Sequence, residues 1–183
     1  GSWKQSADGM RTRYRSRLRR RSARVWKFLL QRGWMMKATI AVDPGKSGGY
    51  AISINGAIEA HPYRDETEFL EHIHELDDRP DLTVIEAAVE EVPKFVGRNI
   101  PGSTTFVLGY HYGWIVGALR ALAIPVHLYR PQVWQKGLSG VREAKGAKKK
   151  RVLRDHATRL FPSLKPTMAT ADAILILRHH LNT

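Results

Sequence analysis

Three short apolar runs separated by turn residues begin the hydrophobic pattern of the chain after residue 36. Their ranges are Lys37–Asp43, Tyr50–Ile54 and Ala57–His61. A proline and three glycines in residues 44–49 separate the first two runs, and the hairpin pair Asn55-Gly56 separates the second from the third. The pattern therefore predicts three consecutive strands joined by tight turns.

Helical and extended patterns alternate along the rest of the chain. Residues 65–76 place four apolar residues on one helical face: Phe69, Leu70, Ile73 and Leu76. The further expected elements are a strand at Ala87–Val92, a helix at Thr104–Ala123 capped by Ser103, a strand at Ile124–Tyr129, a helix ending at Leu160, and a last helix at Thr167–Leu181. This order predicts an α/β fold with an antiparallel edge, in which helices flank one mixed five-stranded sheet.

Three glycines recur every four positions on the longest expected helix, at Gly109, Gly113 and Gly117. Small residues at this spacing predict the close approach of another helix or strand. The face that also carries Trp114 is a candidate interface between two copies of the chain.

Charge divides the chain into two regions. Twelve of the 30 Lys/Arg lie in residues 1–37 with only one acid, Asp8, whereas the remainder has 18 basic and 16 acidic residues. We expect a basic N-terminal arm at 1–36, beginning with a cloning remnant, and one domain at 37–183. The arm suits a polyanion such as nucleic acid, and a cleaved organellar leader and a disordered tail are the alternatives.

Several classes of protein are excluded by composition. The chain has no cysteine, so it has neither disulfides nor a catalytic thiol. No apolar run approaches the roughly 20 residues that span a bilayer, so we expect a soluble protein without a membrane partner.

Asp43 is the first candidate for chemistry because it ends an apolar strand. A carboxylate in such a place is costly unless a cation or hydrogen bonds compensate its charge. Metal binding is one interpretation of Asp43, and an ordinary Asp-Pro-Gly turn is the other. Gly45-Lys46-Ser47 is no phosphate-binding P-loop, because the motif requires a glycine where Ile40 stands.

Other acids far along the chain join Asp43 in the expected fold. The fourth strand carries an acid, and Asp172 lies on the last helix, where a first-turn acid that stabilises the helix dipole is the alternative. Carboxylates that converge only in the fold are the ligands that a two-Mg²⁺ phosphodiesterase site requires.

Five motifs in order give the domain a resemblance to a known family. They are Ile40–Gly45, Val89–Pro93, the Leu-Gly-x-x-x-Gly of Leu108–Gly113, the segment from Gln132-Val133 to Ala147–Val152, and Thr170–Ile176. Together they resemble the RuvC-type Holliday junction resolvases, which have an RNase H-like fold, over roughly residues 37–180.

The resemblance implies that Asp43, Glu90 and Asp172 are catalytic and bind Mg²⁺, with Mn²⁺ as a substitute. Glu86 competes with Glu90 for the role on the fourth strand. Glu90 is preferred because it lies just before Pro93 and its spacing to the long helix fits better. Strand alternation turns Glu91 to the opposite face.

One position departs from the family pattern. Many members carry a fourth acid one helical turn before the last aspartate. In this sequence the position is Ala169, which cannot bind a metal. Impaired or absent catalysis by a junction-binding protein is therefore an alternative to an active nuclease.

The resemblance also implies a DNA-binding surface. The basic residues that fall where the family contacts the junction backbone are Lys145, Lys148, Lys149, Lys150 and Arg151, extended by Arg142. Phe95 follows the strand-four acid, and base stacking or core packing are its two interpretations. A solvated helix face is the alternative for the basic residues, and Trp134 receives no role beyond packing.

The expected function is that of an endonuclease that resolves four-way DNA junctions by symmetric nicks, as in recombination and repair. Paired nicks imply a twofold homodimer. Another RNase H-like nuclease is an alternative, and actin-like ATPases and sugar kinases are disfavoured by chain length. An intracellular setting is expected: the cytoplasm or nucleoid of a bacterium or phage-infected cell, or an organelle matrix.

Overall fold

The protein is described by a computed structural model that covers residues 36–79, 81–93 and 101–183. Its centre is a mixed five-stranded sheet in the order β3-β2-β1-β4-β5. The strands are β1 (Met36–Asp43), β2 (Gly49–Ile54), β3 (Ala57–Pro62), β4 (Leu82–Glu90) and β5 (Val126–Tyr129). The first three pair antiparallel, whereas β4 is parallel to both β1 and β5. The predicted α/β fold, with helices flanking one mixed five-stranded sheet, is confirmed.

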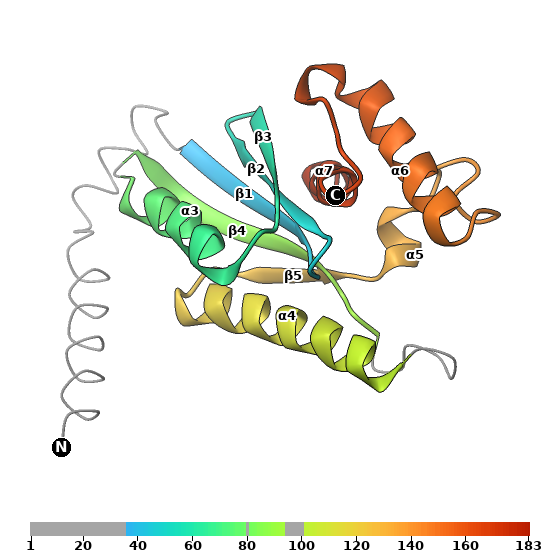
Figure 1. The fold of residues 1–183 in the computed structure, drawn as a ribbon. Coiled ribbons are helices and arrows are strands. Elements are labelled where there is room, and N and C mark those ends of the chain that lie inside the picture. Colours follow the sequence, from blue (N-terminus) through green and yellow to red (C-terminus); the bar gives the residue numbers. More distant parts are fainter. Residues whose placement is uncertain (1–35, 80, 94–100) are drawn as a thin grey trace. The chain divides into compact units, whose positions relative to one another are not determined.

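Helices cover both faces of this sheet (Figure 1). On one face lie α3 (Glu66–Asp78) and α4 (Gly102–Ala121); on the other lie α5 (Pro131–Trp134), α6 (Gly146–Leu160) and α7 (Ala171–Leu181), with a 3₁₀ turn at Pro162–Leu164 before α7. Each face has its own apolar core, because side chains alternate between the two faces along every strand. The sheet is thus buried between two helical layers.

Helix α7 packs directly on the sheet and is buried from Ala171 to Leu177. It begins four residues later than the sequence predicts. The preceding turn is held by reciprocal hydrogen bonds in which the backbone N–H of Thr167 and of Thr170 each donate to the other residue's hydroxyl. The one acid in the buried stretch, Asp172, therefore has a fixed position over the sheet.

Two local predictions are wrong, and the close approach predicted at three glycines is not made within the described part of the chain itself. Strand β4 covers 82–90 rather than 87–92, because it pairs with β1 along nearly all of that strand. Ser103 is no cap: α4 begins at Gly102, and Pro101 precedes it without a side-chain hydrogen bond. Among the described residues nothing packs within 4 Å of a Cβ added at Gly109, Gly113 or Gly117, so no helix or strand of the same chain approaches there.

The basic arm predicted at 1–36 lies outside the described residues except for Met36, the first residue of β1. Within the described part of the chain, no helix combines the length and the apolarity needed to cross a bilayer.

Candidate active site

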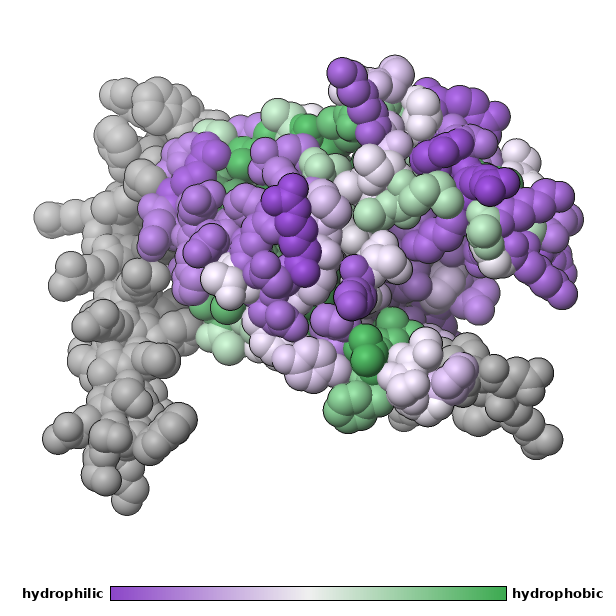
Figure 2. Space-filling view, viewed as in Figure 1, coloured by the Kyte–Doolittle hydropathy of each residue, from purple (hydrophilic) through white to green (hydrophobic). Residues whose placement is uncertain are grey.

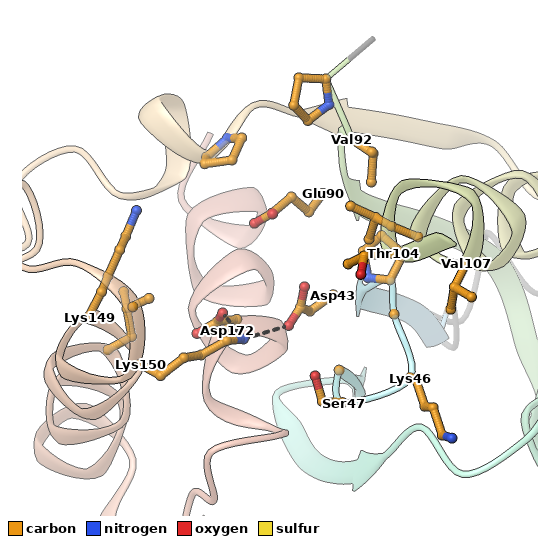
Figure 3. Close-up of a pocket in the computed structure, with 18 of the residues that line it drawn as sticks. Asp43, Lys46, Ser47, Glu90, Val92, Thr104, Val107, Lys149, Lys150 and Asp172 are labelled. Atoms are coloured by element: carbon orange, nitrogen blue, oxygen red, sulfur yellow. Dashed lines mark hydrogen bonds and ion pairs between the residues drawn. The ribbon is translucent and has the colours of Figure 1, made fainter. Parts of the chain in front are cut away.

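Two of the predicted acids end neighbouring parallel strands. Asp43 is the last residue of β1 and Glu90 is the last residue of β4. The register pairs Val42 with Val89, so the two acids lie side by side at the same edge of the sheet. Asp172, in the first turn of α7, points toward both of them (Figure 3). The fold therefore brings together three carboxylates that are far apart in the sequence.

Glycines allow the chain to turn closely beneath this edge. A Cβ added at Gly48 would lie 2.0 Å from the carbonyl oxygen of Asp43, and one at Gly49 would lie 2.6 Å from that of Ala169. No side chain fits at either distance. The glycine turn thus permits the backbone approach that places Asp43 beside the start of α7.

A lysine from α6 enters the carboxylate cluster. The ammonium of Lys150 donates to Asp172 Oδ2 at 2.6 Å and to Asp43 Oδ2 at 3.1 Å (Figure 3). Burial works against this ammonium, but the two carboxylates hold the pKa of Lys150 above its ordinary value. The sequence-based prediction assigned Lys150 to the DNA backbone, whereas in this structure it neutralises part of the charge of the acids.

The remaining negative charge is only partly compensated. Burial, and next the carboxylate of Asp172, raise the pKa of Asp43 to about 6. Burial, followed by the charges of Asp43 and Asp172, raises the pKa of Glu90 to about 8, against the lowering effect of a hydrogen bond from Trp134. The cluster therefore favours the uptake of positive charge, either protons or a cation.

Trp134 is a site residue that the sequence analysis missed. Its indole Nε1 donates to Glu90 Oε2 at 2.9 Å, and its ring is buried against the core under α7. A tryptophan in a connector gives no sequence signal for such a contact, because the partner lies 44 positions away. The hydrogen bond from Trp134 restrains one oxygen of the Glu90 carboxylate.

The donor set fits a divalent cation that prefers oxygen. Asp172 Oδ1 is buried and has no hydrogen-bond partner among the described residues, so it has an acceptor free for a metal. Carboxylate oxygens are the ligands typical of Mg²⁺. Ala169, where the family pattern has an acid, lies in the turn before α7 and contributes no oxygen from its side chain.

The carboxylates open into a cleft of about 820 Å³. Lys149 and Lys150 of α6 and Lys46 of the glycine turn line it (Figure 3). The other basic residues predicted to contact DNA, Lys145, Lys148, Arg151 and Arg142, are exposed. Hydrophilic residues gather over α6 (Figure 2). Phe95, the predicted base-stacking residue, lies outside the described residues.

The two other acids of β4 lie away from the cluster. Glu91 accepts a hydrogen bond from Arg130, with Nε and Oε2 3.1 Å apart. Glu86 lies two pleat repeats further from the strand end, where it pairs with Lys37 and His180 at 2.6 Å each. Neither touches Asp43 or Asp172, so the structure groups Glu90 rather than Glu86 with those two acids.

No family model matches the sequence, and no curated protein sequence is similar to it. Solved structures that resemble the fold include Thermus thermophilus RuvC, at 22% identity and a TM-score of 0.45, with 79% of this chain and 93% of that chain covered. A T. thermophilus RuvC in complex with a Holliday junction substrate matches at 16% identity and a TM-score of 0.48, with 79% and 92% covered. Similarity at this level concerns the chain path and assigns no activity.

Proposed function

We propose that residues 37–183 form a divalent-metal-dependent nuclease that acts on four-way DNA junctions. The observation that carries the proposal is the cluster of Asp43, Glu90 and Asp172 in an open cleft, where one buried carboxylate oxygen has no hydrogen-bond partner in the described part of the chain. Catalysis of phosphodiester hydrolysis by oxygen-bound metals needs such a set of converging acids. The five RuvC-like motifs supply the choice of substrate.

In this proposal the three acids hold Mg²⁺, which would activate water and stabilise the leaving oxygen. Trp134 keeps Glu90 aligned through its indole N–H. Lys150 holds Asp43 and Asp172 together before a metal enters, because one ammonium bonds both carboxylates. Its withdrawal would make both oxygens available.

The DNA backbone is proposed to lie along α6. Lys148 and Arg151 are exposed there, and Lys149 lines the cleft beside the acids. Each contact of this kind neutralises one phosphate and releases counterions, so affinity should fall steeply with salt. The basic arm at 1–36 is proposed to add contacts independent of sequence.

A twofold homodimer is proposed through α4. This helix exposes Phe106 by 74% and Tyr110 by 50%, next to the open glycine positions 109, 113 and 117. Apolar residues gather over this part of the surface (Figure 2). Two such faces would allow close contact between the α4 helices of two copies.

Analytical ultracentrifugation of the wild type and of Phe106→Glu measures whether this dimer forms. A wild-type monomer, with and without DNA, would contradict the proposal.

Cleavage of a labelled four-way junction beside a linear duplex, in Mg²⁺ and in Mn²⁺ with binding followed in parallel, tests the function. Symmetric nicks in the junction alone are expected. Binding without nicks would favour the alternative of a catalytically impaired junction-binding protein, and Ala169→Asp then tests whether the missing acid is the cause. No preference for the junction would contradict the proposed substrate.

A further inference from the structure

A second polar cluster lies under the opposite end of α7. Glu86 of β4, His127 of β5 and His180 of α7 place one ligand-type atom each within 4.8 Å of one another. Glu86 is four residues before Glu90, which corresponds to about 13 Å along a strand. The cluster is thus separate from the carboxylates of the candidate active site, although both lie beneath the same helix.

We propose that Glu86, His127 and His180 form a binding site for Zn²⁺ or a similar borderline-soft transition metal. Two imidazoles and one carboxylate are a ligand set that zinc accepts, whereas Mg²⁺ prefers oxygen alone. The site therefore selects a different ion from the three-acid cluster. It does not depend on the proposed nuclease activity.

The orientation of His180 supports this assignment. Its Nδ1 lies 2.8 Å from the hydroxyl of Tyr129, which accepts a hydrogen bond when the ring proton is on that nitrogen. The other nitrogen, Nε2, donates its proton to Glu86 Oε1, 2.6 Å away, and a metal ion that binds Nε2 would displace this proton. A fixed partner on the far nitrogen is the arrangement that holds metal-binding histidines in place.

Glu86 has an oxygen available for the ion. Its Oε1 pairs with Lys37 and His180, whereas Oε2 lies 3.9 Å from Nε2 of His127. At zinc bond lengths of about 2.0–2.1 Å, tetrahedral ligand atoms are about 3.3 Å apart, so small side-chain rotations suffice. Lys37 is half exposed and keeps its contact with Oε1 or turns to solvent.

The site is open on the side of His127, whose side chain is 48% exposed. An ion can therefore enter without unfolding of the sheet, and water completes its coordination. Bound there, the metal would connect the end of α7 to β4 and β5. The consequence is a metal-dependent stabilisation of the helix that carries Asp172 at its other end.

The experiment is a calorimetric titration of the full chain with ZnCl₂ in excess Mg²⁺, which occupies the oxygen-only site. We expect one equivalent of bound Zn²⁺ and a higher melting temperature. His127→Ala should weaken binding by about tenfold or more, as loss of a metal contact does. His74→Ala, which removes an exposed histidine on α3, is the matched control and should bind as the wild type does.

Circular dichroism of His127→Ala without zinc checks that the variant folds, which its exposed position favours. Glu86→Gln provides a second variant with the same expected loss. The proposal is overturned if the wild type binds no zinc in excess Mg²⁺, or if His127→Ala and Glu86→Gln both bind zinc as tightly as the wild type.

Discussion

Two polar clusters lie beneath α7, one at each end of the helix. One has a surplus of negative charge, whereas in the other the charges are balanced. At one end Asp43 and Asp172 share the ammonium of Lys150, and Glu90 lies beside them without an ion pair to it. At the other end one carboxylate, Glu86, has an ammonium and an imidazole on the same oxygen. Burial works to raise the pKa of Glu86, yet the hydrogen bonds from Lys37 and His180 keep it below its ordinary value.

The comparison isolates the effect of surroundings, because Glu86 and Glu90 are the same residue type on the same face of one strand. The pKa of Glu90 is raised to about 8 by burial and by two neighbouring acids. A surplus of negative charge attracts a hard divalent cation, whereas the balanced cluster offers nitrogen donors. The two ends should therefore differ in their response to substitution, pH and metal.

The largest expected difference is in catalysis by Glu90→Gln and Glu86→Gln. Loss of a metal-binding carboxylate should reduce the rate of junction nicking by about 10³-fold. Glu86→Gln should change it by less than about threefold, because Glu86 touches none of the three acids. Single-turnover cleavage of a labelled junction measures both rates, and a gel-shift assay checks that binding is kept. Equal losses in the two variants would contradict the division of roles.

The second difference is in how the free energy of unfolding of the metal-free protein depends on pH. Asp43 and Glu90 have folded-state pKa values of about 6 and about 8, above the ordinary values. The folded protein therefore binds more protons than the unfolded chain, so the contribution to stability is present at low pH and is lost as pH rises through 6 and 8. The expected fall in the free energy of unfolding is on the order of 2 kcal/mol.

Urea unfolding at pH 5.5 and pH 8.5 measures this fall. Glu90→Gln should reduce it, and saturating Mg²⁺ should offset it by binding the ionised carboxylates. Glu86→Gln is the control and should leave it unchanged, because the lowered pKa of Glu86 lies below this pH range. A fall of the same size in Glu90→Gln would assign the effect to other groups.

Sequence reasoning reached the parts of the molecule that depend on local pattern. The Asp-Pro-Gly end of β1 and the apolar run of α7 each mark an acid beside apolar residues, so Asp43 and Asp172 were candidates, and the family resemblance implied their common role. Lys150 and Trp134 were not, because their partners are set by how α5 and α6 pack against α7. A basic run offers several lysines, and only the packed helix shows which one turns inward.

Substitution of Lys150 therefore offers a finer test of the three-acid cluster. Its ammonium occupies the oxygens that a divalent ion needs, so Lys150→Gln should tighten Mn²⁺ binding at pH 8 by about tenfold. Calorimetry measures the affinity. Lys149→Gln is a matched control, because it removes a neighbouring lysine that lines the same cleft. Unchanged or weaker binding in Lys150→Gln would show that the ammonium and the metal do not compete.

Trp134 is expected to have the smallest effect. Trp134→Phe keeps an aromatic ring in the core but removes the N–H that bonds Glu90 at 2.9 Å. That bond lowers the pKa of Glu90, so its loss raises the pKa further and leaves less carboxylate for a metal at neutral pH. Mn²⁺ affinity should fall by about threefold at pH 7, the scale of one hydrogen bond.

At pH 9.5 the loss in Trp134→Phe should shrink, because Glu90 is then ionised in both proteins. Affinity for Zn²⁺ in excess Mg²⁺ should not change, since Trp134 bonds Glu90 of the three-acid cluster and is not part of the cluster of Glu86, His127 and His180. A loss of Mn²⁺ affinity that is equal at pH 7 and pH 9.5 would indicate that Trp134 aligns the Glu90 carboxylate without tuning its proton affinity. The pH dependence thus separates the electrostatic role of one hydrogen bond from its geometric role.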